Sequence, residues 1–321
     1  MALSSPATVG PKAAERSVAD QLTRGGADWA GIVFRILLLA SLAFSILVLV
    51  ALITEVLGTG SGVLTDRFAD FMTGTLRQDA SEAGLMQGLV GSAWICVFVM
   101  LLAFPLGIAA AIYLEEYAAD TRFSRFVNVN IRNLAGVPSV VYGILGFTIF
   151  TKALREFTGV ERAQGRTLMA AGLTLAILVL PIVIITAAEA VRAVPSALRE
   201  GAYGVGATRS EVIRTQVLPY AAPGIITGLI LSLARALGEA APLILVGATT
   251  GRLAGDPSFL DLGQLRERFT ALPIIVTGWT QNNRQGFDEI AAAAIIVMLA
   301  IVVVANTVAI LLRNRYEKKR N

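Results

Sequence analysis

Several long runs of apolar residues constrain the fold of this chain more than any other feature. The chain has 321 residues, of which 55% are hydrophobic and only 16% are charged, and its mean hydropathy is +0.69. A soluble domain normally carries about 25% charged residues. Several runs approach or exceed about 18 residues, the length at which an apolar helix can cross a bilayer. We therefore predict an all-α integral membrane protein and not one large soluble core.

Six runs are predicted to be membrane-spanning helices, at residues 30–57, 86–114, 132–151, 168–191, 225–249 and 290–312. The third is short and contains Gly136, Pro138 and Gly143. Breaks of this kind are tolerated inside a membrane where neighbouring helices or a wet cavity satisfy the freed backbone groups. The predicted organisation is a disordered N-terminal tail over 1–29, a transmembrane domain over 30–312 and a short tail over 313–321.

An even number of spans places both ends of the chain on the same side of the membrane. The C-terminal tail from Arg313 to Arg320 is strongly basic, and cytoplasmic segments carry an excess of Lys and Arg. We therefore expect both termini and the loop 192–224 to lie in the cytoplasm. Residues 1–28 are polar and the first apolar run is long enough to remain as a helix, so no cleavable signal peptide is expected.

The residue types that the chain lacks exclude several kinds of chemistry. It contains no histidine and a single cysteine, Cys96, which rules out Ser-His-Asp catalysis, ordinary His-ligated zinc and an internal disulfide. It also lacks the G-x-x-x-x-G-K-[ST] loop that cradles the phosphates of ATP. We therefore expect a chain that is not an enzyme and that binds no metal or cofactor of its own.

Two charged residues, Arg235 and Glu239, lie near the middle of the apolar run from Ile225 to Thr249. Ionised groups at that depth are costly unless they are paired or wetted, so they usually line a pathway or an interior seam. Arg235 is the only basic residue in the middle of a predicted span, and Glu239 lies four residues on, on the same helical face. The pair indicates either a charged pathway or a structural ion pair, between helices or with a partner subunit.

The loop 192–224 has structure of its own. Ser196 is a good N-cap for a short helix, and Gly206 allows a sharp turn after it. The segment Thr208–Glu211 fits a capping box that starts a second helix, which we expect to end at Pro219. A helix pair with exposed apolar side chains needs either a partner protein to cover it or a place on the lipid headgroups.

The outer loop 250–289 is long and mostly polar, except for the apolar stretch Leu272–Trp279. This stretch is too short to cross a bilayer, and Trp279 suits the headgroup region. We expect it to lie at the membrane interface, and the alternative is a docking surface for an external protein.

The same cytoplasmic loop carries a recognisable motif. It reads Glu200-Gly-Ala-Tyr-Gly-Val-Gly206, with Leu218-Pro219 following, and this resembles the EAA motif of ABC-importer permeases. The positions that match are Glu200, Ala202, Gly206, Leu218 and Pro219. Gly201 replaces the usual second alanine, and Gln216 replaces a common apolar residue. The resemblance implies that this loop seats on an ATPase subunit.

Two further stretches narrow the resemblance. Ala135–Gly143 and Ala236–Leu243 are similar to the phosphate-specific transport permeases, and the Ala-Pro-Leu ending of the second is closer to PstA subunits than to PstC subunits. The similarity covers nearly all of residues 30–312. It implies the six-helix, MetI-like fold of a type I ABC importer in a bacterial cytoplasmic (inner) membrane. The implied partners are a PstC-like permease, two ATPase subunits that hold ATP and Mg, and an extracytoplasmic phosphate-binding protein.

The resemblance also gives the charged and loop residues their roles. It implies ATPase coupling through Glu200, Gly201, Ala202, Gly206, Leu218 and Pro219. Arg235 would line the phosphate path, because a guanidinium is always charged and binds oxyanions bidentately. Glu239 would limit the cost of that cation while the path is empty. The alternatives are a permease for another oxyanion, such as sulfate or molybdate, and a stand-alone anion channel, which has no need of the EAA-like loop.

Overall fold

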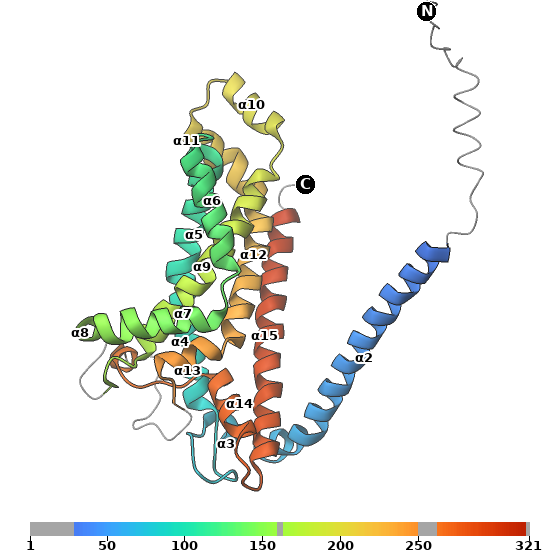
Figure 1. Ribbon diagram of the computed structural model, residues 1–321, viewed down its shortest axis with the longest axis vertical. Coiled ribbons are helices and arrows are strands. Elements are labelled where there is room, and N and C mark those ends of the chain that lie inside the picture. Colours follow the sequence, from blue (N-terminus) through green and yellow to red (C-terminus); the bar gives the residue numbers. More distant parts are fainter. Residues whose placement is uncertain (1–28, 159–162, 250–261, 319–321) are drawn as a thin grey trace, which may run out of the picture. The chain divides into compact units, whose positions relative to one another are not determined.

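Figure 1 shows the computed structural model, which describes residues 29–158, 163–249 and 262–318. These described residues form helices and no strand. Five of their helices are long and apolar enough to cross a membrane: Trp29–Asp66, Met86–Tyr117, Leu168–Arg192, Arg209–Gly238 and Phe287–Arg315. A bent pair, Arg122–Ala135 with Ser139–Ala153, supplies a sixth span if it is counted as one. The predicted all-α membrane fold is confirmed, while the predicted N-terminal tail lies outside the described residues except for Trp29.

Contacts within the chain divide it into two units at Glu55, and each is described by itself. The helix α2 (Trp29–Asp66) begins in the first unit and ends in the second. Its described part in the first unit is an uninterrupted apolar helix, as the first predicted span requires. The second unit holds the remaining helices.

The second unit is built around α9 (Leu168–Arg192), whose side chains Leu175, Val179 and Val183 are fully buried. It packs against α4 (Met86–Phe98), α5 (Phe104–Ile112) and α12 (Leu218–Gly238). Small residues allow the close approach, since a Cβ at Gly228 of α12 would lie 2.3 Å from the Thr186 hydroxyl of α9. The core therefore lies between helices that are far apart in the sequence.

A second core closes the other end of this unit. It joins α3 (Phe68–Thr73), α14 (Leu272–Thr280) and α15 (Phe287–Lys318). Trp279 of α14 is 3% exposed, and its ring lies 6.1 Å from that of Phe71. Protein therefore covers the ring of Trp279, and its position at headgroup depth stays a prediction.

Two prolines follow short π-helical segments inside long helices. The segment η1 (Val99–Ala103) precedes Pro105 in α5, and η5 (Ile213–Val217) precedes Pro219 in α12. A proline lacks an N–H and its ring collides with the carbonyl four residues earlier, and the wider π turn relieves this conflict. The helix that begins at α11 (Arg209–Val212) therefore runs on through Pro219 into the membrane span. The predicted helix end at Pro219 is wrong.

The third predicted span, 132–151, is not a straight helix. The helix α6 (Arg122–Ala135) ends there, and α7 (Ser139–Gly146) with η3 (Phe147–Ala153) leaves at 98° to it. Pro138 causes the break, because it cannot donate to the Leu134 carbonyl. That carbonyl instead accepts the Tyr142 hydroxyl at 2.8 Å.

The fifth predicted span, 225–249, is broken in the same way. The helix α12 ends at Gly238, Glu239 is extended (φ −81°, ψ 111°), and α13 (Ala241–Val246) follows. Pro242 would collide with the Gly238 carbonyl if the helix continued, so the chain turns there. The apolar run is long enough for one helix, but a single proline divides it.

Candidate functional site

The two helix breaks meet. The helices α7 and α13 cross the bundle at the same level and pack against one another (Figure 1). Gly143 permits the contact, because a Cβ there would lie only 2.7 Å from the Cα of Pro242. We call this region, formed by α7, α13 and the turns that precede them, the break junction. The two stretches that resemble phosphate permeases are the two sides of this junction.

Broken helices in a membrane are informative about function. A bilayer core offers no hydrogen-bonding partner, so non-helical backbone is tolerated there only where protein buries it or where it lines a water-filled cavity. Transporters place substrate sites at such discontinuities. The junction is therefore the first part of the described chain in which to look for a substrate site.

Arg235 and Glu239 lie at the α12 side of the break junction. The Nε atom of Arg235 is 3.3 Å from Oε1 of Glu239, and the two side chains are 48% and 17% exposed. Arg235 occupies the last turn of α12, where the carbonyl end of the helix favours a positive charge. Glu239 is outside the helix, so the pairing is as predicted although the two residues do not share one helical face.

Three hydroxyls that could serve a passing anion are occupied in this conformation. Tyr142 donates to the Leu134 carbonyl at 2.8 Å, Thr186 to Ile182 at 3.0 Å, and Thr249 to Phe269 at 3.2 Å. A hydroxyl has a single hydrogen, so none of these three donates to an oxyanion in this state. Arg235 is therefore a charged donor beside the junction, apart from these three hydroxyls.

The EAA-like loop forms a helix, a turn and a second helix, as predicted. The helix α10 spans Ser196–Gly204, with Pro195 and not Ser196 as its N-cap. Gly206 has φ +87°, a conformation that side chains other than glycine rarely adopt. The Thr208 backbone N–H donates to Glu211 at 2.7 Å, which completes the predicted capping box. The turn is thus fixed by one glycine and one capping box.

The motif residues of this loop are presented on its surface. Glu200, Gly201, Gly206 and Pro219 are exposed, and Ala202 and Leu218 are half-buried. Beside them, Val205 is 86% exposed, and Tyr203 and Leu198 are also exposed. An apolar side chain as open as Val205 on a loop outside the bundle suits a partner protein that covers it.

Comparison with known proteins identifies the family to which the chain belongs. Residues 103–320 match the family described as binding-protein-dependent transport system inner membrane component. The chain belongs to this family. The permease is 32% identical, over 70% of its own length, to the phosphate transport system permease protein PstA 1 of Mycobacterium tuberculosis H37Rv, and this match covers 64% of that protein.

Other comparisons support the same fold, but the names of these proteins are less specific about the transported substrate. The permease is 35% identical over 54% of its length to the probable ABC transporter permease protein YqgH of Bacillus subtilis, of which the match covers 55%. It thus spans little more than half of some of the curated relatives it matches. A subunit of a solved bacterial ABC transporter for the polysaccharide alginate superposes on 89% of the permease and 98% of that subunit, with a TM-score of 0.61 at 18% identity. This likeness confirms the importer-permease fold alone.

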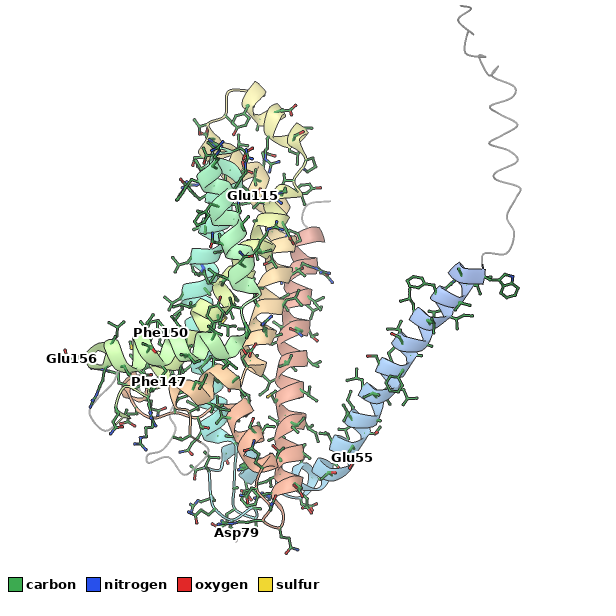
Figure 2. The ribbon with its side chains drawn as sticks, viewed as in Figure 1. Glu55, Asp79, Glu115, Phe147, Phe150 and Glu156 are labelled. Atoms are coloured by element: carbon green, nitrogen blue, oxygen red, sulfur yellow. The ribbon has the colours of Figure 1, made fainter. Side chains whose placement is uncertain are left out.

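Two ion pairs of the permease were not indicated by its sequence. Arg192 contacts Glu115 at 2.5 Å. Arg199 contacts Glu116 at 2.8 Å. Figure 2 shows Glu115 at the end of the bundle that carries α10. The only local signal was the pair of adjacent carboxylates at the end of an apolar helix, and their partners are 77 and 83 residues away.

Proposed function

We propose that this permease is the PstA-like subunit of an ATP-driven importer of inorganic phosphate. The observation that carries the proposal is that the two phosphate-permease-like stretches form one break junction, with Arg235 and Glu239 at its edge. The similarity to PstA 1 of Mycobacterium tuberculosis supports phosphate as the substrate. The permease would form the path together with a PstC-like permease, with an extracytoplasmic phosphate-binding protein at one face and an ATPase dimer at the other.

Arg235 suits the path of a phosphate ion. Phosphate must cross a slab of low dielectric where a bare anion is very costly, and a guanidinium offers fixed charge and a planar donor fork. The side chain is half exposed on this single chain, so it can face a path shared with a second permease. Glu239 holds the guanidinium when no anion is present and releases it when phosphate binds.

The loop with α10 suits the coupling role. Its exposed apolar residues offer a docking surface to the ATPase, and Glu200 is exposed for an ion pair with that subunit. ATP and Mg bind on the ATPase, and the permease itself catalyses no reaction. The C-terminal end of α15 lies toward the end of the bundle that carries α10 (Figure 1). This agrees with a cytoplasmic C-terminus if that end of the bundle faces the cytoplasm.

Reconstitution tests the proposal directly. We expect the permease, co-expressed with a PstC-like permease, an ABC ATPase and a phosphate-binding protein from the same organism, to purify as one complex. In vesicles the complex should import radioactive phosphate only when ATP is supplied. Competition by sulfate or molybdate at equal concentration should be weak, and strong competition would assign the path to one of those oxyanions. Anion flux through the permease alone, without ATP, would instead identify a channel.

Gly206 provides a test of the coupling loop. A valine at this position must adopt a left-handed backbone, which costs a residue with a Cβ roughly 1–2 kcal/mol. Asparagine tolerates that backbone, so Gly206→Asn should lose much less than Gly206→Val. No atom lies within 4 Å of a Cβ at this glycine, so steric crowding cannot explain a difference. We expect Gly206→Val to reduce recovery of the ATPase with the purified permease, and equal recovery for both variants would contradict the assigned turn.

A further inference from the structure

Two consecutive carboxylates lie at the end of the bundle that carries α10. Glu115 and Glu116 lie in the π-helical segment η2 (Tyr113–Tyr117), which extends α5. Glu115 accepts two hydrogen bonds from Arg192, at 2.5 and 3.1 Å. Glu116 accepts two from Arg199, at 2.8 and 3.1 Å. The two ion pairs lie side by side but connect different parts of the chain.

Arg199 makes more contacts than a simple ion pair. Its guanidinium also donates to the Val194 carbonyl at 2.6 Å and to the Val191 carbonyl at 2.9 Å. Val191 lies in the last turn of α9, and Val194 lies two residues beyond the end of that helix. The guanidinium of Arg199 on α10 thus contacts both the end of α5 and the end of α9.

The neighbouring pair differs in what it connects. Arg192 belongs to α9 itself and is 57% exposed, so its contact with Glu115 joins α5 to α9 only. Arg199 is 21% exposed and Glu116 only 6%. Removing Arg199 would leave a buried carboxylate without its cation, which is far more disruptive than removing an exposed partner.

Few other contacts fix α10 to the bundle: Ala202 packs against the core that includes Val212 and Val217, and α10 contacts α11 and η5. No residue of α10 is buried, and its apolar side chains Leu198 and Tyr203 are exposed. Arg199 is therefore the charged side chain of α10 that contacts η2 and the end of α9. The other routes from α10 to the membrane helices are the contact of α10 with η5 and the backbone, through Pro195 at one end and the Gly206 turn at the other.

We propose that Arg199 is the positioning residue that ties α10 to the membrane helices, so that a displacement of α10 is transmitted to α5 through Glu116 and to α9 through the Val191 carbonyl. This inference rests on the proposed function, in which the ATPase moves α10. It adds a specific mechanical link that neither the EAA-like motif nor the break junction contains.

The test compares Arg199→Met with Arg192→Met, which breaks the neighbouring pair without touching α10. The first readout is amide hydrogen exchange of residues 196–204 in the purified full-length permease, which does not depend on any substrate. The second is phosphate imported per ATP hydrolysed in the assembled transporter. We expect Arg199→Met to accelerate exchange in α10 by about tenfold and to lower the import ratio by at least about fivefold.

The control variants separate the possible outcomes. Arg192→Met should leave α10 exchange unchanged. Arg199→Lys should fall between wild type and Arg199→Met, because lysine keeps the charge but presents a compact ammonium in place of the planar guanidinium. Unchanged exchange in Arg199→Met overturns the proposal, and so does faster exchange with a normal import ratio. Equal effects of Arg192→Met and Arg199→Met also overturn it. A wild-type complex that imports no phosphate refutes the proposed substrate instead, and the exchange comparison still decides whether Arg199 holds α10.

Discussion

Replacing Arg235 by glutamine should lower ATP-dependent phosphate uptake by about tenfold or more, because hydrogen bonds to charged groups contribute about 1.5–3 kcal/mol each. Glutamine keeps much of the length and polarity of the side chain but loses the charge and the donor fork. The loss should be visible in the initial uptake rate of reconstituted transporter at several phosphate concentrations. Recovery of the ATPase with the purified complex is the control for assembly.

Arg235→Lys is the matched variant for geometry. Lysine keeps the positive charge but presents a single ammonium in place of the planar fork, so its uptake should lie between those of wild type and Arg235→Gln. Uptake by Arg235→Lys equal to that of Arg235→Gln would mean that the fork matters and the charge alone does not.

The companion variant is Glu239→Gln. The carboxylate contacts Arg235 in the empty conformation at 3.3 Å, and it would repel phosphate if left unpaired. We therefore expect Glu239→Gln to disturb the release of the guanidinium, and hence coupling or gating, more than the affinity for phosphate. A half-saturating phosphate concentration near that of wild type, together with a lower maximal uptake rate, would agree with this role.

Near-normal uptake by Arg235→Gln in a fully assembled complex would refute the path role. The same conclusion would follow from a structure of the assembly in which Arg235 faces lipid acyl chains or is sealed away from any solvent cavity. In either case the contact with Glu239 would be a structural ion pair, which is the other interpretation that the sequence allowed.

The sequence predicted those features that depend on neighbouring residues. The apolar runs identified the membrane helices, and Thr208 with Glu211 identified the start of α11, because a capping box involves residues only three apart. The prolines at 138 and 242 were visible as interruptions. Their consequence was not, because a proline frees the carbonyl four residues earlier but does not set the direction in which the chain continues.

That direction depends on packing between distant segments. The helix α7 leaves α6 at 98° because it can lie against α13, about a hundred residues further along the chain. The same is true of Arg199, whose partner Glu116 is 83 residues away. A single sequence shows which residues are charged but not which of them meet. The resemblance to phosphate permeases marked the correct stretches without indicating that they form one junction.

Gly143→Ala should destabilise the permease by overpacking the contact between α7 and α13. The new Cβ would lie 2.7 Å from the Cα of Pro242 and 2.7 Å from Cδ1 of Leu245. Leu245 can change rotamer, but the backbone at Pro242 cannot move without shifting α13. Overpacking of this kind costs about 1–3 kcal/mol in a well-packed core.

The matched control, Gly136, lies in the turn that precedes α7. A Cβ at Gly136 would lie 3.5 Å from the Asn133 carbonyl, an ordinary contact, and its φ of −88° suits any residue. Gly136→Ala should therefore keep the wild-type denaturation temperature in detergent, whereas Gly143→Ala should denature several degrees lower and import less phosphate. If both variants denature and transport like wild type, α7 and α13 do not meet at Gly143. The two helix breaks would then not form one junction, and Arg235 would not lie beside a site made from both of them.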